Sequence, residues 1–469
     1  MKIPLSSRPL FLVVVLSVLS LVSHLRAANG TWNTTSSANY SAGGNWAGGV
    51  VATGTGATMT YQAAGNGQTI TIDTPVTLGS ILFNNTSSST ATRQVTLALG
   101  AGSLTFDTGS SSPALIEMLS SGGTGDRELT LGAFTTTGTG GLEVRNSSTQ
   151  GIQRVRFNAT SSLNGGVLTL TNNQSTLLDI RGQTSNPFGT SAAPDVIFVG
   201  TGSTSITVSS GLNLTYGTIN GTSANASLGM APGGQSFTFG GSTNGSFAGR
   251  LTGSGTFVKA GSGVQTLTGT NTNSGSIHVN AGTLLINGQG SSIVSVNTGT
   301  LGGTGHTGGN VTVGNTGVLA PGNSAGMLGV NSLTLAGPGS TLAMELAGTG
   351  SGQYDQISVT GAVNLDGNGT LELTLLSFVP AMNDKFFLVL NDGSDAINGT
   401  LFNLAQDATF LAAGYEWKIS YTGDSDTNVF SGVGNDLVVM AVPEPGAVLL
   451  CGLGIALLLG RTNRRRLLR

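Results

Sequence analysis

The chain has 469 residues and contains 75 glycines, while only 8% of its residues are charged and 6% are aromatic. Its formal net charge of −3 provides no basic surface for nucleic acid, which excludes a general nucleic-acid-binding function. Disordered chains usually combine low hydrophobicity with high net charge. Hydrophobic residues make up 38% of this chain and follow a regular pattern, so we expect a folded body.

The N-terminus has the layout of a secretory signal peptide. Lys2 and Arg8 precede an apolar run at residues 10–22, and the small residues Ala27 and Ala28 follow it. A basic start, an apolar core and a small-residue exit are typical of such segments. We therefore expect residues 1–27 to direct export through Sec, with cleavage near Ala27. If the segment is not cut it acts as a signal anchor, and in both cases the rest of the chain is exported.

Residues 28–250 form a series of short apolar–polar alternations bounded by Gly, Asn and Ser. Examples are residues 70–72, 95–99 and 196–199, where β-branched or aromatic residues recur with a period of two. Between residues 31 and 442 no stretch shows sustained helical periodicity. A long series of strands this short fits a solenoid, because each coil buries its inward side chains only by stacking on its neighbours. The sequence therefore predicts an all-β chain with a solenoid in this region.

Two tryptophans stand at the start of this region, as Trp32-Asn33 and Asn45-Trp46. They resemble the tryptophan–asparagine opening of secreted repeat proteins. The first coil of a solenoid exposes an apolar end that must be covered, so we assign both tryptophans to an N-terminal cap. The alternative is that Trp32 or Trp46 stacks on a sugar ring.

Residues 251–336 contain the clearest repeat unit. Four short strands fall in residues 251–288, with a Phe-Val-Lys ending at Lys259, a Leu-Thr-Gly-x-Asn at 267–271 and an Ala-Gly-Thr-Leu at 281–284. This pattern resembles the autotransporter-associated β-strand repeat, apart from Ala260, which is inserted after the lysine. The resemblance implies a right-handed parallel β-helix.

Composition changes near residue 337. Twelve of the 21 acidic residues lie between Glu345 and Asp436, and longer strands are expected at residues 341–346, 370–375 and 385–390. We interpret residues 337–441 as a C-terminal β region that caps the solenoid.

The last segment, residues 442–469, has three parts in order. Pro443-Glu444-Pro445 is followed by an apolar run at residues 447–459 and then by a basic cluster that comprises Arg461, Arg464, Arg465 and Arg466. A 13-residue helix is about 20 Å long, which is short for a bilayer core of about 30 Å. The combination resembles the PEP-CTERM sorting signal. That resemblance implies a transient inner-membrane anchor and processing by an exosortase-type sorting enzyme, and the alternative is a permanent anchor.

Candidate catalytic groups are few. The only cysteine, Cys451, lies in the apolar tail, and the exported body has two histidines, His278 and His306, with no spaced metal-ligand partners. Arg154 and Arg156 lie two residues apart on one strand and form the best basic pair for a polysaccharide lyase. Stacking could bring Asp126 or Glu143 near them, although a surface charge ladder is the simpler interpretation.

Calcium is the one cofactor that the sequence raises. Residues 432–437 fit a single Gly-x-Gly-x-Asp-x-apolar calcium repeat that contains Asp436, and Asp424 and Asp426 lie just upstream. Such repeats bind calcium as a stacked series, and one copy is more typical of a tight turn, so we assign no metal site.

Taken together, these features predict an exported, non-enzymatic surface or extracellular-matrix protein. Its role would be structural or adhesive, with exopolysaccharide as a candidate partner. A polysaccharide-active lyase or glycosidase on the same fold is the alternative, because fold alone does not decide activity.

Overall fold

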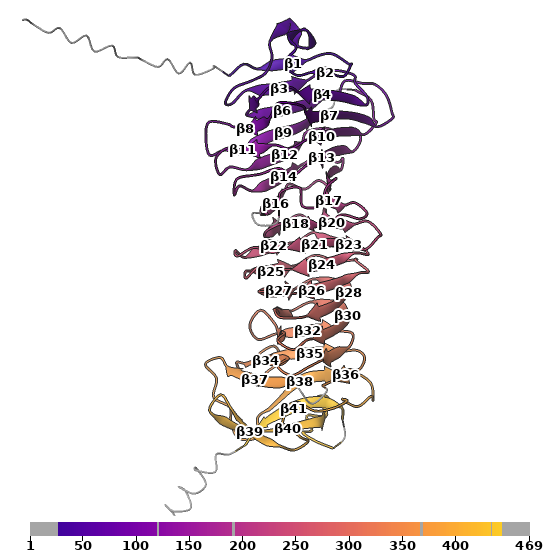
Figure 1. Cartoon of the computed structure of the whole chain (residues 1–469). Helices are drawn as coiled ribbons and strands as arrows, with labels where there is room; N and C mark the ends of the chain where they lie inside the picture. The colour runs from indigo at the N-terminus through magenta and orange to yellow at the C-terminus, as the bar shows by residue number, and fades with distance from the viewer. Residues whose placement is uncertain (1–26, 120–121, 190–192, 366–368, 433, 443–469) are drawn as a thin grey trace, which may run out of the picture.

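A computed structural model describes residues 27–119, 122–189, 193–365, 369–432 and 434–442. Over these residues the chain is a long column of stacked coils that starts at β1 and ends in a small antiparallel sheet (Figure 1). Apart from two 3₁₀ helices, η1 (Gly43–Asn45) and η2 (Ala47–Gly49), every regular element there is a β-strand. The predicted parallel β-solenoid with a C-terminal β cap is confirmed.

The predicted sorting segment beyond Val442, and all of the predicted signal peptide except Ala27, lie outside the described residues. No helix within the described part of the chain has the length and hydropathy needed to cross a membrane.

The longest wall of the column is a parallel sheet of 15 strands that runs almost its full length. Its strands, in spatial order, are β1 (Gly30–Trp32), β3 (Thr58–Tyr61), β6 (Ser80–Asn84), β9 (Ala114–Leu119), β12 (Leu142–Asn146), β14 (Leu168–Asn172), β16 (Val196–Val199), β19 (Ile219–Gly221), β22 (Gly245–Phe247), β25 (Val264–Leu267), β27 (Thr283–Ile286), β29 (Thr300–Gly303), β31 (Val318–Pro321), β34 (Thr341–Leu346) and β37 (Thr370–Leu375).

The second wall, also parallel, has nine strands and covers the N-terminal half of the column. Its order is β2 (Ala38–Asn39), β4 (Gln68–Ile72), β7 (Arg93–Leu99), β10 (Arg127–Leu131), β13 (Gln153–Phe157), β15 (Leu178–Gly182), β17 (Thr204–Val208), β20 (Ala226–Met230) and β23 (Arg250–Gly253). A third, three-stranded parallel sheet accompanies it, formed by β5 (Val76–Leu78), β8 (Leu104–Phe106) and β11 (Thr135–Thr136).

A 14-stranded sheet runs beside the 15-stranded one through the C-terminal half, and its first strands share coils with the last strands of the nine-stranded sheet. Its parallel part comprises β18 (Leu214–Thr215), β21 (Ser236–Phe239), β24 (Thr256–Lys259), β26 (Ser276–Val279), β28 (Gln289–Val296), β30 (His306–Val313), β32 (Met327–Val330), β35 (Gln356–Val359) and β38 (Lys385–Asn391). A short branch is formed by β33 (Leu333–Leu335), which pairs with β30, and β36 (Val363–Asn364), which pairs with β33. The sheet then continues as an antiparallel part through β41 (Asp436–Ala441), β40 (Tyr415–Gly423) and β39 (Thr409–Ala412).

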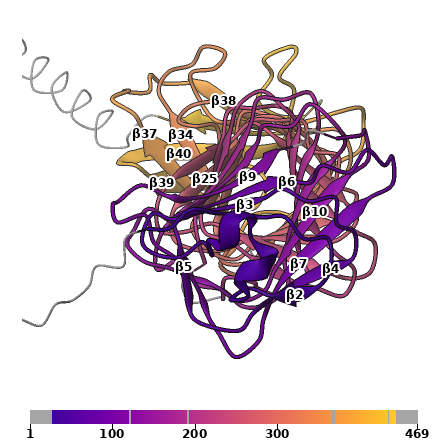
Figure 2. The same cartoon turned by 90° about the horizontal axis from the view of Figure 1, so that it is seen from above.

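Strand alternation builds one continuous core. In β4, for example, Gln68, Ile70 and Ile72 are buried while the two threonines between them face outward. The same inward–outward alternation recurs in coil after coil, and the view along the axis shows the coils superimposed around one interior (Figure 2). Because a strand's side chains alternate between its two faces, each coil presents a row of apolar residues inward and a row of polar residues outward.

Aromatic rings stack along the axis inside the column. Phe157 and Phe188 have ring centroids 5.0 Å apart, and Tyr216 lies 5.6 Å from Phe237, which is 5.9 Å from Phe257. These residues come from successive coils. Offset and edge-on ring pairs of this kind add about 1 kcal/mol each beyond the burial of their area, so the stack ties neighbouring coils together.

The two N-terminal tryptophans cover the first coil, as predicted. Trp32 is fully buried and Trp46 is 3% exposed, and their ring centroids lie 5.3 Å apart in an edge-on arrangement. The indole N–H of Trp46 donates to the backbone carbonyl of Tyr40, whose hydroxyl donates to the carbonyl of Ala52. The alternative that Trp32 or Trp46 stacks on a sugar is wrong, because neither ring is accessible.

Glycines line the corners where coils press together. Gly249, Gly269, Gly288 and Gly305 form one column, and a Cβ atom on each of the last three would overlap the carbonyl oxygen of the glycine one coil earlier. Gly282 has a positive φ of 59°, and a Cβ there would lie 2.5 Å from the carbonyl oxygen of Gly261. The abundance of glycine therefore follows from close backbone contact between coils at their corners.

The topology changes later than the composition does. Parallel pairing continues through β34, β37 and β35 to β38, well past the predicted boundary at residue 337, and antiparallel pairing begins only between β38 and β41. β39 and β40 are joined by a tight two-residue hairpin at Ala413 and Gly414, both with positive φ. The acidic residues of this region therefore lie partly on solenoid coils and partly on the antiparallel sheet, β38–β41, which we call the C-terminal cap.

Candidate functional site

Charged side chains form a ladder on the outer face of the nine-stranded sheet. Arg154 of β13 lies between Glu128 of β10, with a shortest distance of 3.3 Å, and Asp179 of β15, at 3.0 Å. Arg156 Nε lies 2.7 Å from Glu128, a close charge contact rather than a directed hydrogen bond, and Arg181 lies 2.7 Å from Asp179. The strand register fixes this arrangement, because Glu128, Arg154 and Asp179 are direct neighbours across three strands.

The expected surface charge ladder is therefore present, but its acidic members differ from those considered from the sequence. Asp126 accepts the backbone N–H of Ile152, and Glu143 pairs with Arg145 on the 15-stranded sheet. A signal for the true partners exists in the sequence, since Glu128 precedes Arg154 by 26 residues and Asp179 follows it by 25. One coil in this region has about that length. The spacing therefore identifies the partners of Arg154, but only once the strand register is known.

The ladder is electrostatically satisfied. Burial would raise the pKa of the Asp179 carboxyl, but the charge of Arg181 and hydrogen bonds from Arg154, Ser205 and Arg181 outweigh it, and the pKa is lowered. A lyase needs a basic group that is free to take a proton. Arg154 and Arg156 both contact carboxylates, so this face favours a structural role over catalysis.

Two successive coils, one with β24 and β25 and the next with β26 and β27, contain the repeat at residues 251–288. Lys259 ends β24 with its side chain turned inward, and its ammonium donates to the carbonyl oxygens of Ala260, Gly261 and Ala281 at 2.8–2.9 Å. Burial lowers the pKa of this lysine to about 8. The repeat's lysine thus joins the corners of successive coils and is not available as an external base.

Residues 257–286 match the passenger-associated-transport-repeat family. The match runs from β24 to β27 through both of these coils and supports the predicted autotransporter-associated repeat. It suggests an exported, passenger-type surface protein. No curated protein matches the chain.

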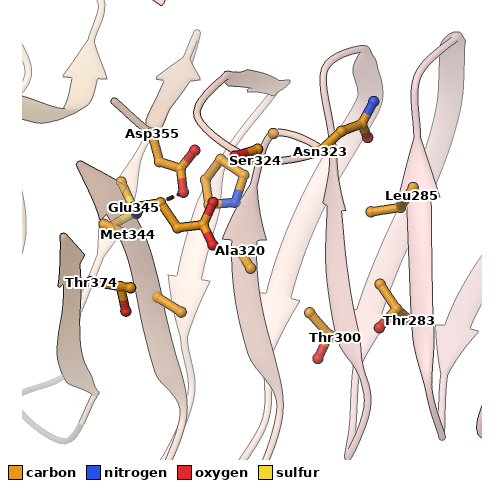
Figure 3. A pocket seen from close by; sticks show the side chains of 13 residues that line it. Thr283, Leu285, Thr300, Ala320, Asn323, Ser324, Met344, Glu345, Asp355 and Thr374 are labelled. Atoms are coloured by element: carbon orange, nitrogen blue, oxygen red, sulfur yellow. Dashed lines mark hydrogen bonds between the residues drawn. The ribbon is translucent and has the colours of Figure 1, made fainter. Parts of the chain in front are cut away.

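The transport repeat contributes Thr283 and Leu285 to a hollow of about 320 Å³ on the outer face of the 15-stranded sheet. Figure 3 shows this hollow, with Glu345 and Asp355 at one side and the two threonines Thr283 and Thr300 at the other. Its remaining lining residues include apolar and hydroxyl side chains of β31, β34 and β37. This site is not recognisable in the sequence, because its residues come from five strands and from connecting segments, and the outermost two, Thr283 and Thr374, lie 91 positions apart.

Asp355 is the most perturbed acid in the hollow. It is 1% exposed, and its carboxylate accepts the backbone N–H groups of Gly326 at 2.9 Å and Glu345 at 2.8 Å. Burial raises the pKa of this carboxyl to about 7, although the two N–H groups act in the opposite direction. The hollow therefore combines an acid that holds its proton near neutral pH with a second carboxyl, Glu345, on the adjoining strand.

The three calcium candidates come together at a separate hollow of about 430 Å³ in the C-terminal cap. Asp436 accepts the backbone N–H groups of Asn391 and Ser425, and Asp424 accepts those of Asp426 and Thr427. The bonds of Asp424, to residues two and three positions later, are typical of a turn-forming aspartate, whereas Asp436 joins segments that are distant in the chain. Among the described residues, no group of three or more His, Cys, Asp or Glu side chains has the geometry to hold a metal ion.

Both histidines have local partners. A ring nitrogen of His278, Nε2, lies 3.1 Å from Ser276 Oγ on the same strand, and Nδ1 of His306 accepts the backbone N–H of Gly308 at 2.8 Å. Neither residue lines the hollow that contains Glu345 and Asp355. These contacts give each histidine a structural role at its strand or turn.

Proposed function

We propose that this chain is an exported cell-surface or extracellular-matrix protein with a structural or adhesive role, and that it has no catalytic activity. The match to the passenger-associated-transport-repeat within a continuous solenoid is the observation that carries this proposal. The sequence signals at the two ends of the chain support it. The N-terminal segment directs export through Sec, and the Pro443-Glu444-Pro445 tail passes through the inner membrane before an exosortase-type enzyme releases the protein.

The outer faces of the column offer repeated hydrogen-bonding groups to a polymer. Hydroxyl pairs join neighbouring coils, such as Thr58 with Ser80 at 2.8 Å. Exposed amide pairs do the same, as in Asn280 with Asn297 at 2.7 Å and Asn310 with Asn331 at 2.8 Å. Neighbouring strands lie about 4.8 Å apart, so these groups form regular rows along the axis. Exopolysaccharide, with its own regularly spaced hydroxyls, is the partner that this surface fits best.

Binding to exopolysaccharide from the native host tests this function. We expect the purified protein to sediment with the polymer, and we expect deletion of the gene to reduce cell aggregation. If the protein does not bind the polymer and aggregation of the deletion strain is unchanged, the adhesive role is wrong. A mature form that ends near Pro443 at the cell surface would support sorting, whereas an intact Arg469 in the inner membrane would contradict it.

A glycosidase is the second candidate, and the Glu345–Asp355 hollow is the observation that favours it. Glycoside hydrolysis uses two carboxyl groups, one of which must keep its proton at the working pH. The raised pKa of Asp355 meets that requirement, and Glu345 would serve as the second carboxyl group. Release of reducing ends from the same polysaccharide, lost in Glu345→Gln, would establish this activity. No release by the unaltered protein would exclude it for that substrate.

A further inference from the structure

The three most exposed large apolar side chains of the described residues lie on β39 and in the segment between β37 and β38. They are Leu411, which is 82% exposed, Val379, which is 73% exposed, and Met382, which is 63% exposed. Apolar side chains that gather at one exposed place usually mark a contact surface. We call this group the apolar tip.

Backbone pairing places Met382 near Leu411, and Val379 precedes Met382 by three residues in the chain. The backbone N–H of Asn383, next to Met382, donates to the carbonyl of Ala441 at the end of β41. The next residue, Val442, donates to the carbonyl of Glu416 at the start of β40, and Glu416 is the direct partner of Leu411 on β39. Three strand steps therefore separate Met382 from Leu411, a distance of about 15 Å.

The chain leaves the cap through the middle of the apolar tip. Val442 is the last described residue, and it lies on the same strand end as the contacts just named. In Figure 1, β39, β40 and β41 form the end of the column opposite β1. A membrane or protein that binds the chain directly after Val442 must therefore also lie close to Leu411 and Met382.

The number of residues between Val442 and the apolar run limits how far the cap can lie from a membrane that the run enters. Only four residues, Pro443 to Gly446, separate Val442 from the apolar run at 447–459. Four residues extend at most about 14 Å. If the apolar run enters a bilayer, Val442 must lie within about that distance of it, which brings its neighbours Met382 and Leu411 close to the headgroups.

We propose that the apolar tip is a membrane-docking surface that inserts into the lipid interface and orients the column away from the bilayer. This inference rests on the proposed membrane step of the tail. Leu411 is held rigidly, because the hairpin at Ala413 and Gly414 is tight and the indole N–H of Trp417 donates to the carbonyl of Ala412 at 2.9 Å. An apolar run of only 13 residues inserts weakly into a bilayer. Apolar contact between the tip and the lipid interface would therefore add substantially to membrane binding.

Fluorescent labels on single cysteines of the full chain test the proposal, with vesicles of phosphatidylethanolamine and phosphatidylglycerol in a 3:1 ratio as the membrane. The native Cys451 reports on the tail, L411C with C451S reports on the apolar tip, and V50C with C451S is the control, because the backbone of Val50 lies against Gly30 of β1 at the opposite end. We expect lipid-borne quenchers to reduce the emission of the labels at 451 and 411 and to leave the label at 50 unchanged.

The outcomes separate this proposal from the proposed function. Quenching at 451 without quenching at 411 overturns the docking surface and leaves the tail's membrane step intact. Absence of quenching at 451 contradicts that step itself. A shift of the 411 emission without vesicles means that a second copy or the tail covers the apolar tip, which also overturns the proposal.

A second measurement uses no label. We expect the double variant M382D and L411D of the full chain to bind the same vesicles about tenfold more weakly, because two apolar contacts are replaced by charges. The variant V50D, which alters a half-exposed apolar residue at the other end, should bind like the unaltered chain. Equal binding by all three proteins would contradict the docking surface.

Discussion

The solenoid and the C-terminal cap bury their strands in different ways. In the solenoid every coil is parallel to the next and has apolar neighbours on both sides, so its core depends on the adjoining coils. In the cap, β38, β41, β40 and β39 pair in antiparallel fashion around Phe386 and Trp417, and β39 forms an edge with no further coil beyond it. Stacked coils set no limit to the length of a column, so the antiparallel cap is what ends it, and the exposed edge of the cap is free to acquire a separate function.

The largest loss of stability should come from removing the buried tryptophan that covers either end of the column. Trp417 of β40 is fully buried inside the cap, and Trp417→Ala should destabilise the cap by about 3–5 kcal/mol. Because each coil contacts only its neighbours, hydrogen exchange should speed up in β38–β41 and then in β35, with little change at β1. Trp32→Ala should produce the mirror image at the N-terminal end. Uniform loss of protection along the whole chain in either variant would mean that the column unfolds as one unit.

A second difference in stability should come from glycines at positive φ, because a glycine at a solenoid corner contacts the neighbouring coil and one in the cap hairpin does not. Gly282→Ala should cost about 2–4 kcal/mol, because a Cβ there is both strained by the positive φ and pressed against the carbonyl of Gly261. Gly414 in the cap hairpin also has a positive φ, but no atom lies within 4 Å of an added Cβ. Gly414→Ala should therefore cost only about 1 kcal/mol. Chemical denaturation of both variants checks this, and equal costs would contradict the role assigned to coil contact.

The junction of solenoid and cap should carry a pH dependence. The folded state raises the pKa of Asp355 from its ordinary value of 3.8 to about 7, so between pH 4 and pH 7 the folded form binds more protons than the unfolded form. Stability should thus fall by about 4 kcal/mol as pH rises through this window and should then level off. Thermal unfolding across this range measures the effect. The variant Asp355→Asn should remove the slope, and an unchanged slope would assign it to other groups.

The smallest losses of stability should come from removing a carboxylate from an ion pair. Glu128→Gln leaves two partly buried arginines with one fewer carboxylate and should cost about 1–2 kcal/mol. The cap offers a matched control in the exposed pair of Lys418 and Asp407, whose side chains are 33% and 47% exposed. Asp407→Asn should change stability by less than about 0.5 kcal/mol. Similar costs in denaturant titrations would show that the ladder is no more than a surface feature.

Much of the site could not be anticipated from the sequence because it depends on register. Arg154 and Arg156 were recognisable as a pair, but the choice of Glu128 and Asp179 as partners, instead of Asp126 and Glu143, depends on which residues face each other across strands. The hollow around Asp355 went unrecognised for the same reason. Its acidic residues are ordinary in sequence, and only the fold buries one of them beside the other.

The sequence by itself determined the class of fold. Period-two alternation with glycine turns leaves few alternatives to stacked parallel coils, and the two aromatic residues Trp32 and Trp46 were identifiable as a cap because a solenoid must cover its first coil. Tertiary structure alone decided where the solenoid ends, which charges meet and which apolar side chains remain exposed. These features arise from contacts between residues far apart in the chain, and short-range patterns carry no information about such contacts until the coils are stacked.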